Sequence, residues 1–313
     1  MGRWNMGTWP RSTEGCVVTT FADPRMTATP SELIGSPAIP LPAIPMVPKK
    51  ARHLWHKLHD HTILRLRFIS LWVRRGLGIV QPRTLDPALL PHGLTLVLPG
   101  IESESVFSYG MCDGLFEGGV KGAIRVFNWG LPFPGGYLSN LTRVDRNRRR
   151  AADIAREICA YQDAYPGRPV HLVAQSGGAG LAIFAAESMP HGRSIDGIVL
   201  LGGALSPTYN LARALANTRK GILNSHSIKD NLILGLGTRL FGTVDRKFTK
   251  SCGCVGFSIP ENLTPAERDL YDRKLAQLAW DPCMADSCHH WGGHLSSGGE
   301  VYLAKYIAPW IQG

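Results

Sequence analysis

The stretch that most constrains the fold of this chain covers residues 169–190. It begins with a short apolar run at residues 170–173, typical of a buried strand, and ends in an alanine-rich segment typical of a helix. Between them lies a glycine-marked turn, Ala174-Gln175-Ser176-Gly177-Gly178. A serine at such a turn is held above the carboxyl end of its strand, near the positive end of the following helix. The segment therefore predicts a strand, a sharp turn that presents Ser176, and a helix.

Small residues flank this serine where the backbone is most crowded. Only small side chains fit two positions before and two positions after it, because those backbone segments nearly touch, and Ala174 and Gly178 meet this requirement. The turn resembles the nucleophile elbow of the α/β-hydrolase family, with alanine in place of the usual first glycine. A glycine-rich phosphate-binding turn and a plain packing turn are the alternative readings. Phosphate binding is disfavoured because no lysine follows the glycines and the Gly-x-Gly-x-x-Gly order is absent.

From residue 93 the pattern alternates between strand and helix, which is typical of a parallel sheet covered on both faces. Predicted strands besides that of the serine segment are residues 94–98, 122–127, 194–201, 221–224 and 251–257. Further predicted helices are residues 145–165, 211–219, 265–280 and 299–311. The resemblance implies an α/β-hydrolase fold, with a mostly parallel sheet and helices on both faces. We expect the arginines at the start of helix 145–165 to form a solvated first turn: Arg146, Arg148, Arg149 and Arg150.

A serine hydroxyl becomes a good nucleophile only when an imidazole accepts its proton and a carboxylate orients that imidazole. In the resembled family these groups follow in the order Ser, acid, His, from loops at the carboxyl edge of the sheet. No acid lies between Asp196, at the amino end of its strand, and Asp230. Asp230 is therefore the favoured acid. Asp245 is the reserve candidate, with pairing to Arg246 as its simpler role.

The histidines that follow this acid are His289, His290 and His294. His294 lies in a glycine turn shortly before the terminal helix, which resembles the family's usual place for the catalytic histidine. We therefore favour His294, with His290 next. His171 and His191 flank the serine segment but precede the acid, so structural roles are expected for them.

Acyl transfer also needs two N–H groups that stabilise the negative charge on the carbonyl oxygen. The resemblance implies the residue after the nucleophile, Gly177, as one donor. The other is implied on the loop after strand 94–98, where Pro99-Gly100-Ile101 forms a glycine-marked turn and Ile101 is the predicted donor. Three polar residues follow near the expected mouth of the site, with loop solvation or helix capping as their simpler role: Glu102, Ser103 and Ser105.

Four cysteines offer a competing zinc site: Cys252, Cys254, Cys283 and Cys288. Thiolates are good zinc ligands. However, Cys252 and Cys254 are separated by one residue and would alternate across the predicted strand, so both cannot easily face one metal. Ordinary thiols are favoured, and no metal or cofactor is expected.

Length and composition allow one large α/β domain. The chain has 313 residues, of which 44% are hydrophobic, enough for a substantial core. It contains no uncharged apolar stretch long enough to span a membrane and no secretory-signal pattern at its start. Seven cysteines are more typical of a reducing compartment than of a disulfide framework. The expectation is a cytoplasmic protein.

The net charge of +10 is concentrated in residues 49–83. This segment contains nine cationic residues and one acid, Asp60, and so contributes +8. The cations are Lys49, Lys50, Arg52, Lys57, Arg65, Arg67, Arg74, Arg75 and Arg83. Residues 1–48 have few periodic apolar positions and are proline-rich from residue 30, which predicts an arm outside the fold. Met26 is an alternative start of translation. The sequence predicts a basic helical segment over residues 49–92 and a catalytic domain over residues 93–313.

Residues 51–76 can form an amphipathic helix with Leu54, Leu58, Leu64, Phe68 and Trp72 near one face. Packing on the domain, with the basic side solvated, is the favoured role. The alternative is contact with an anionic membrane surface or an acidic partner, which would make the protein peripheral at a membrane. Nucleic acid is not expected, because no binding module is recognised and the aromatic residues are not interleaved for stacking.

The predicted function is hydrolysis of a carboxylic ester, as in an esterase or lipase-like enzyme, with a small-molecule ester or lipid as substrate. Thioester, lactone or amide substrates would use the same residues, because the fold does not determine the substrate. A non-catalytic, hydrolase-like binding or membrane-surface module is the alternative from another class. The joint presence of Ser176, Asp230 and His294 argues against it.

Overall fold

The computed structural model describes residues 86–131 and 136–313, which belong to one of the chain's two compact units, Leu71–Gly313. The predictions for residues 1–48 and for the basic helix at residues 51–76 lie outside the described residues.

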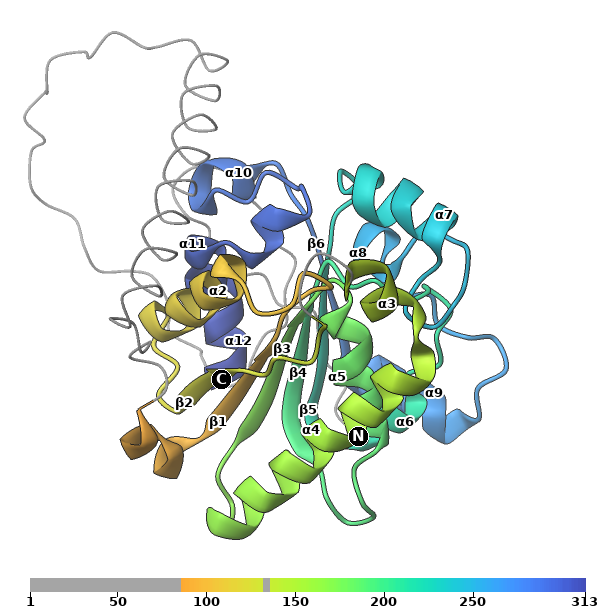
Figure 1. Ribbon diagram of the computed structural model, residues 1–313. Helices are drawn as coiled ribbons and strands as arrows, with labels where there is room; N and C mark the ends of the chain where they lie inside the picture. The colour runs from red at the N-terminus through yellow and green to blue at the C-terminus, as the bar shows by residue number, and fades with distance from the viewer. Residues whose placement is uncertain (1–85, 132–135) are drawn as a thin grey trace, which may run out of the picture. The chain divides into compact units, whose positions relative to one another are not determined.

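Six strands form one sheet in which every neighbouring pair is parallel, in the order β2-β1-β3-β4-β5-β6 (Figure 1). The strands are β1 (Leu94–Leu98), β2 (Ala123–Val126), β3 (Val170–Gln175), β4 (Ile195–Leu201), β5 (Thr218–His226) and β6 (Leu275–Ala279). The carboxyl ends of all six therefore meet at one edge. The predicted α/β class with a parallel sheet is confirmed.

Helices cover both faces of the sheet (Figure 1). One layer contains α4 (Val144–Ala164), α5 (Gly178–Glu187), α6 (Ala212–Ala216) and α9 (Pro265–Lys274). The other contains α2 (Val106–Glu117), α11 (Glu300–Tyr302), η5 (Leu303–Ile307) and α12 (Ala308–Gln312). The shorter helices are η2 (Pro87–His92), α3 (Gly136–Thr142), η3 (Asn231–Gly237), α7 (Thr238–Phe241), α8 (Cys252–Val255), α10 (Cys283–Cys288) and η4 (Leu295–Gly298).

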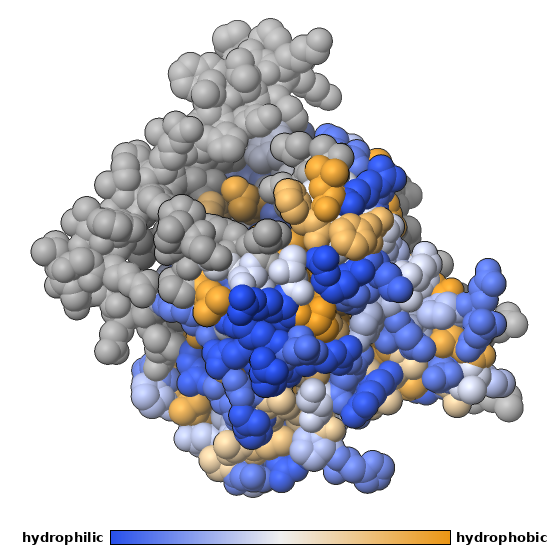
Figure 2. Space-filling model, turned by 45° about the vertical axis from the view of Figure 1, so that its right-hand side comes forward, coloured by the Kyte–Doolittle hydropathy of each residue, from blue (hydrophilic) through white to orange (hydrophobic). Residues whose placement is uncertain are grey.

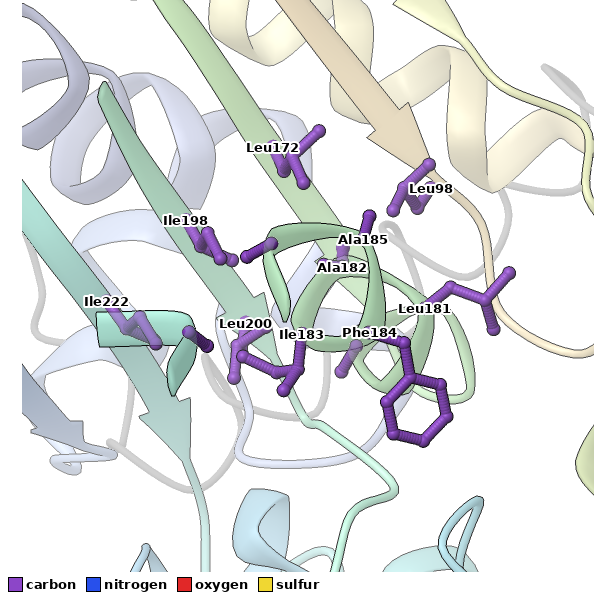
Figure 3. Close-up of a cluster of buried hydrophobic side chains, with 14 of the residues drawn as sticks. Leu98, Leu172, Leu181, Ala182, Ile183, Phe184, Ala185, Ile198, Leu200 and Ile222 are labelled. Atoms are coloured by element: carbon purple, nitrogen blue, oxygen red, sulfur yellow. The ribbon is translucent and has the colours of Figure 1, made fainter. Parts of the chain in front are cut away.

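The core lies between the sheet and the alanine-rich helix α5. Every residue of β1 and β3 is buried, because helices cover the strands on both faces. Leu172 and Ile198 point from the sheet toward Ala182 and Ile183 of α5 (Figure 3). The small side chains of α5 allow close packing on the strands, and each large aliphatic side chain buried there stabilises the fold by about 1.5–3 kcal/mol. This packing fixes the position of the turn that joins β3 to α5.

Two predicted elements near the carboxyl terminus are wrong. Residues 251–257 were expected to form the last strand, but residues 252–255 form the short helix α8. The predicted helix 265–280 ends at Lys274, and its last part is the edge strand β6. In β6, Ala276 and Leu278 are buried between more exposed neighbours, and the strand pairs with β5. Pairing with an open sheet edge therefore overrides the helix-forming composition of this segment.

Candidate active site

Ser176 lies in the turn between β3 and α5 with a left-handed backbone, at φ 52°. A residue with a side chain adopts this conformation at an energetic cost, so the surrounding structure must hold it in place. The Ser176 N–H donates to the carbonyl of Leu201 at 3.1 Å, and the Ala204 N–H donates to the Ser176 carbonyl at 2.9 Å. The side chain of Ser176 is thus presented at the carboxyl edge of the sheet, as expected of a nucleophile elbow.

Gly178 occupies a position where no side chain fits. A Cβ atom there would lie 2.4 Å from the carbonyl oxygen of Pro99 and 2.5 Å from that of Leu98. Ala174, on the other side of the serine, is fully buried and pairs with Leu98 across the sheet. The predicted crowding around the serine is confirmed at Gly178.

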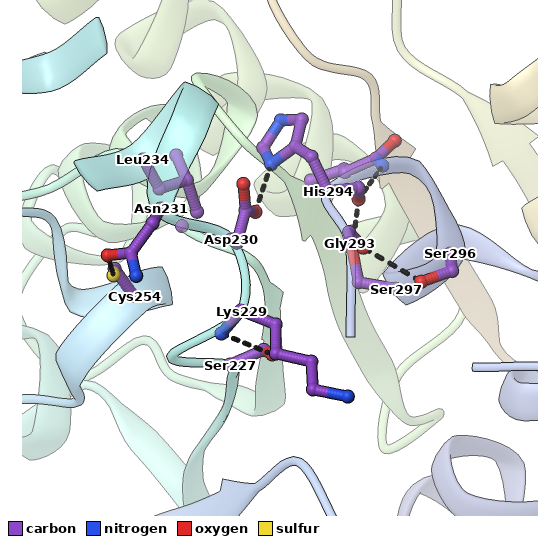
Figure 4. Close-up of polar contacts among 12 residues, drawn as sticks. Ser227, Lys229, Asp230, Asn231, Leu234, Cys254, Gly293, His294, Ser296 and Ser297 are labelled. Carbon is purple, nitrogen blue, oxygen red and sulfur yellow. Dashed lines mark hydrogen bonds and ion pairs between the residues drawn. The ribbon is translucent and has the colours of Figure 1, made fainter. Parts of the chain in front are cut away.

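Asp230 and His294 form a hydrogen-bonded pair (Figure 4). His294 Nδ1 lies 2.6 Å from Asp230 Oδ2, and both side chains are less than 10% exposed. Asp230 follows β5 and His294 follows β6, so loops after two neighbouring strands meet here. A carboxylate bonded to Nδ1 orients the imidazole so that Nε2 can face a nucleophile.

This pair lies on the same edge of the sheet as the serine turn. Gln175, the residue before Ser176, donates from its side chain to the carbonyl of His294 at 3.4 Å. A Cβ atom added to Gly202, which follows β4, would lie 3.5 Å from His294 Nδ1. The structure therefore gathers the serine turn and the Asp230–His294 pair around the carboxyl ends of β3, β4 and β5.

The second-choice acid and histidine have other partners. Asp245 accepts hydrogen bonds from the N–H and the hydroxyl of Ser206, at 2.9 and 2.5 Å, rather than pairing with an imidazole. His290 is buried, its Nδ1 lies 2.9 Å from Ser296 Oγ, and its ring lies 4.5 Å from that of Tyr302. Burial lowers the pKa of His290 to about 4, so it is neutral near pH 7.

The loop after β1 lies beside the residue that follows the serine. A Cβ atom on Gly177 would lie 2.7 Å from Ile101 Cγ2 and 3.6 Å from the Trp129 ring. Two side chains hold this loop: Trp129 Nε1 donates to the Pro99 carbonyl at 2.8 Å, and Asn140 Nδ2 donates to the Ile101 carbonyl at 2.9 Å. With both carbonyls held by these donors, the loop has one defined conformation next to Gly177.

Sequence reasoning missed both of these supporting side chains. Trp129 lies three residues after the end of β2, and a tryptophan just past a predicted strand was the one available signal. Asn140 lies within α3, and no local pattern relates it to residue 101. Both are fully buried, and their partners are about 30 to 40 residues away in the chain.

Glu102 folds back over the same loop and accepts a hydrogen bond from the Gly100 N–H at 3.2 Å. Burial raises the pKa of its carboxyl, while these backbone hydrogen bonds and the nearby His294 act in the opposite direction. The Glu102 side chain is half-buried and bonds within its own loop, so it is not simply solvated. Ser105 precedes the first turn of α2 as its N-cap, which agrees with the capping role, and Ser103 has a left-handed backbone at φ 68°.

The arginines at the start of α4 are not all solvated as predicted. Arg148 and Arg149 are exposed. Arg146 and Arg150 instead donate to the backbone carbonyls of residues 129 and 128, at 2.7 and 2.9 Å. They attach the amino end of α4 to the loop that carries Trp129.

Three of the four candidate cysteines carry thiols that donate hydrogen bonds to oxygen atoms, whereas Cys283 is disulfide-bonded, so the expectation of an ordinary thiol is wrong for Cys283. Cys252 Sγ contacts the Gly203 carbonyl at 3.4 Å, and Cys288 Sγ contacts the Met284 carbonyl at 3.0 Å. Among the residues that the structure describes, no three His, Cys, Asp or Glu side chains gather as a metal site would require. Within the same residues, none of the helices is both long and apolar enough to cross a bilayer.

No protein-family model matches the chain, and no curated protein matches it by sequence. Among solved structures, it is similar to a dienelactone hydrolase-like promiscuous phosphotriesterase from metagenomic libraries, at 15% identity and a TM-score of 0.41, over 71% of this chain and 86% of that one. It is also similar to an esterase, at 14% identity and a TM-score of 0.36, over 61% of this chain and 84% of that one. It is similar as well to a YdeN-like hydrolase from Pectobacterium atrosepticum, at 16% identity and a TM-score of 0.33, over 71% of this chain and 93% of that one.

These likenesses do not bear on the reaction or on the substrate. The fold itself has the features expected from the sequence: an all-parallel sheet between two helical layers, and a serine at a left-handed strand-to-helix turn. The described residues therefore have the architecture of an α/β-hydrolase fold.

Proposed function

We propose that this chain is a serine hydrolase that cleaves carboxylic esters through Ser176, His294 and Asp230. The observation that carries the proposal is the 2.6 Å hydrogen bond between His294 and Asp230, on the edge of the sheet where Ser176 sits in its left-handed turn. A buried carboxylate bonded to Nδ1 keeps the imidazole in the tautomer whose Nε2 can accept a proton.

The reaction proceeds in two halves. Ser176 Oγ attacks the ester carbonyl carbon while its proton passes to His294 Nε2, and the carbonyl oxygen takes up the negative charge. When the tetrahedral intermediate collapses, the carbon–oxygen bond to the alcohol breaks and His294 returns the proton to that alcohol. Water then attacks the acyl-enzyme by the same route, with His294 accepting its proton, and releases the acid and free Ser176.

The oxyanion is stabilised by the N–H groups of Gly177 and Ile101. Gly177 begins the amino end of α5, where the helix dipole favours negative charge. The contact between Ile101 and Gly177, together with the bonds from Trp129 and Asn140, supports this assignment. Fixed donors of this kind contribute about 3 kcal/mol each to transition-state stabilisation.

Labelling with a fluorophosphonate tests the nucleophile. The wild type should be labelled, Ser176→Ala should not, and His294→Ala should react much more slowly. Ser188→Ala is a matched control, because this exposed serine ends α5 and its hydroxyl donates to the Phe184 carbonyl. Equal labelling of all four proteins would exclude the proposed mechanism.

Turnover of a matched ester, thioester and anilide then distinguishes the substrate classes, since all three use the same residues. We expect the ester to be cleaved fastest. The membrane-surface role predicted for residues 51–76 remains a separate prediction, which vesicle binding with and without that segment would test.

A further inference from the structure

Three large apolar side chains stand exposed on the segment that follows Asp230. Leu240, Phe241 and Phe248 are 62%, 53% and 62% exposed. We call these three residues, with the turn between them, the apolar tip. In the upper right of the coloured surface in Figure 2, apolar side chains (orange) lie next to strongly hydrophilic ones (blue). Large exposed apolar groups gathered in one place indicate an interaction surface.

The apolar tip is a defined turn. The N–H of Thr243 donates to the Lys247 carbonyl at 2.9 Å, and the Lys247 N–H donates to Thr243 Oγ1 at 3.0 Å. Arg246 donates to the Phe241 carbonyl at 2.7 Å and lies 5.1 Å from the centre of the Phe248 ring. These contacts hold the aromatic side chains in the exposed position, so little ordering is needed when they bind.

The charges around the apolar tip have one sign. Residues 238–250 carry four cations and one acid, a net charge of +3: Arg239, Arg246, Lys247 and Lys250 against Asp245. The Asp245 carboxylate is bonded to Ser206, so it does not pair with these cations. Apolar side chains surrounded by Lys and Arg are complementary to an anionic lipid surface, where the apolar groups enter the acyl region and the cations meet the head groups.

The apolar tip is linked to the serine turn by hydrogen bonds through Ala204. The Val244 N–H donates to the Ala204 carbonyl at 2.9 Å, and the Ala204 N–H donates to the Ser176 carbonyl at 2.9 Å. A Cβ atom on Gly180, in the first turns of α5, would lie 2.6 Å from Val244 Cγ1. A surface bound by the apolar tip would therefore lie on the side of the molecule that carries Ser176.

We propose that the apolar tip docks on anionic lipid bilayers, inserting Leu240, Phe241 and Phe248 while the surrounding cations bind the acidic head groups. The inference concerns binding alone and does not depend on the proposed esterase reaction.

Sedimentation with sucrose-loaded vesicles tests the proposal on the full chain. The vesicles contain phosphatidylcholine, either alone or mixed equally with phosphatidylserine. The variant Leu240→Ser/Phe241→Ser/Phe248→Ser should lose about tenfold or more in partitioning onto the mixed vesicles. The variant Arg239→Gln/Lys247→Gln/Lys250→Gln should lose about fivefold per cation on mixed vesicles and little on phosphatidylcholine alone. Phe116→Ser is the matched control, because Phe116 is 43% exposed on α2, away from the tip.

The basic segment at residues 51–76 can also attract anionic lipid, so the apolar-tip variant is repeated with Lys57, Arg65 and Arg67 changed to Gln. The same relative loss in this background supports the proposal. Unchanged partitioning of the apolar-tip variant in both backgrounds overturns it. Circular dichroism and hydrolysis of a soluble ester check folding. If neither the wild type nor the variant cleaves the ester, the proposed function fails while the binding result still stands.

Discussion

The imidazole of His294 and the carboxylate of Asp230 are joined by a 2.6 Å hydrogen bond although the two residues are 64 positions apart in the sequence. Their loops meet because β5 and β6 are neighbours in the sheet and end at the same edge. Asp230 should therefore be the residue that controls the histidine.

Asp230→Asn should lower kcat by about four orders of magnitude, because an amide favours the wrong imidazole tautomer and cannot stabilise the imidazolium. Steady-state hydrolysis of a soluble chromogenic ester measures this effect. Asp245→Asn is the control. It weakens the bonds to Ser206 and should cost about 1–3 kcal/mol of folding free energy, with kcat changed only a few-fold. The acid assignment would move to Asp245 if the two variants exchanged these outcomes.

Gly178→Ala should destabilise the protein by about 3 kcal/mol or more, because its Cβ would meet two backbone carbonyl oxygens that cannot move aside. Urea unfolding followed by circular dichroism measures the change. Gly293→Ala is the comparison, since nothing lies within 4 Å of a Cβ at that position, and it should alter the free energy of unfolding by less than about 1 kcal/mol. Similar stability of both variants would contradict the crowding inferred at the serine turn.

Trp129→Phe should impair the loop after β1. It removes the donor to the Pro99 carbonyl and leaves that buried acceptor unsatisfied, at a cost of about 1–3 kcal/mol in folding free energy. Because the same loop carries Ile101, kcat for ester hydrolysis should fall by about tenfold or more. Trp310→Phe is the control. Trp310 lies in α12, where its ring contacts Lys220 of β5, and its replacement should leave kcat unchanged. An unaltered kcat in Trp129→Phe would show that the Trp129 hydrogen bond to this loop is not needed for ester hydrolysis.

The free energy of unfolding should fall as the pH drops from 6.5 to 4. Burial lowers the pKa of His171 and of His290 to about 4, from the ordinary value of 6.5. In this window the unfolded histidines bind protons and the folded ones do not, so acid favours the unfolded state. At about 1.4 kcal/mol per pKa unit, each histidine accounts for at most about 3.5 kcal/mol. Near His171, Asp196 raises this pKa and Lys220 lowers it, both less strongly than burial.

His171→Asn should make this pH dependence shallower, whatever its effect on stability at pH 7. The exposed His191 is the control, and His191→Asn should leave the slope unchanged. Urea titrations across the window measure both slopes. An equally steep curve for His171→Asn would rule out His171 as a source of the acid sensitivity.

The central strands and the serine turn follow from local sequence. Residues 94–98 and 170–175 are mostly apolar because helices cover both faces of those strands, and such stretches are visible without knowledge of their neighbours. The turn at Ser176 could be recognised because neighbouring backbone segments approach it so closely that only small residues fit on either side, and Ala174 and Gly178 are small. Each of these features depends on residues a few positions apart.

Tertiary structure decided the features that depend on distant residues. Residues 275–279 have a helix-forming composition, and only the free edge of β5 makes them a strand. Asp230 bonds to His294 only because the loops after β5 and β6 meet at one edge of the sheet, and Trp129 bonds to a carbonyl 30 residues away in the chain. The spacing of apolar residues along a segment shows which side of that segment is buried in the core. Which loops converge at the end of the sheet is set by strand order, and that order is a property of the whole chain.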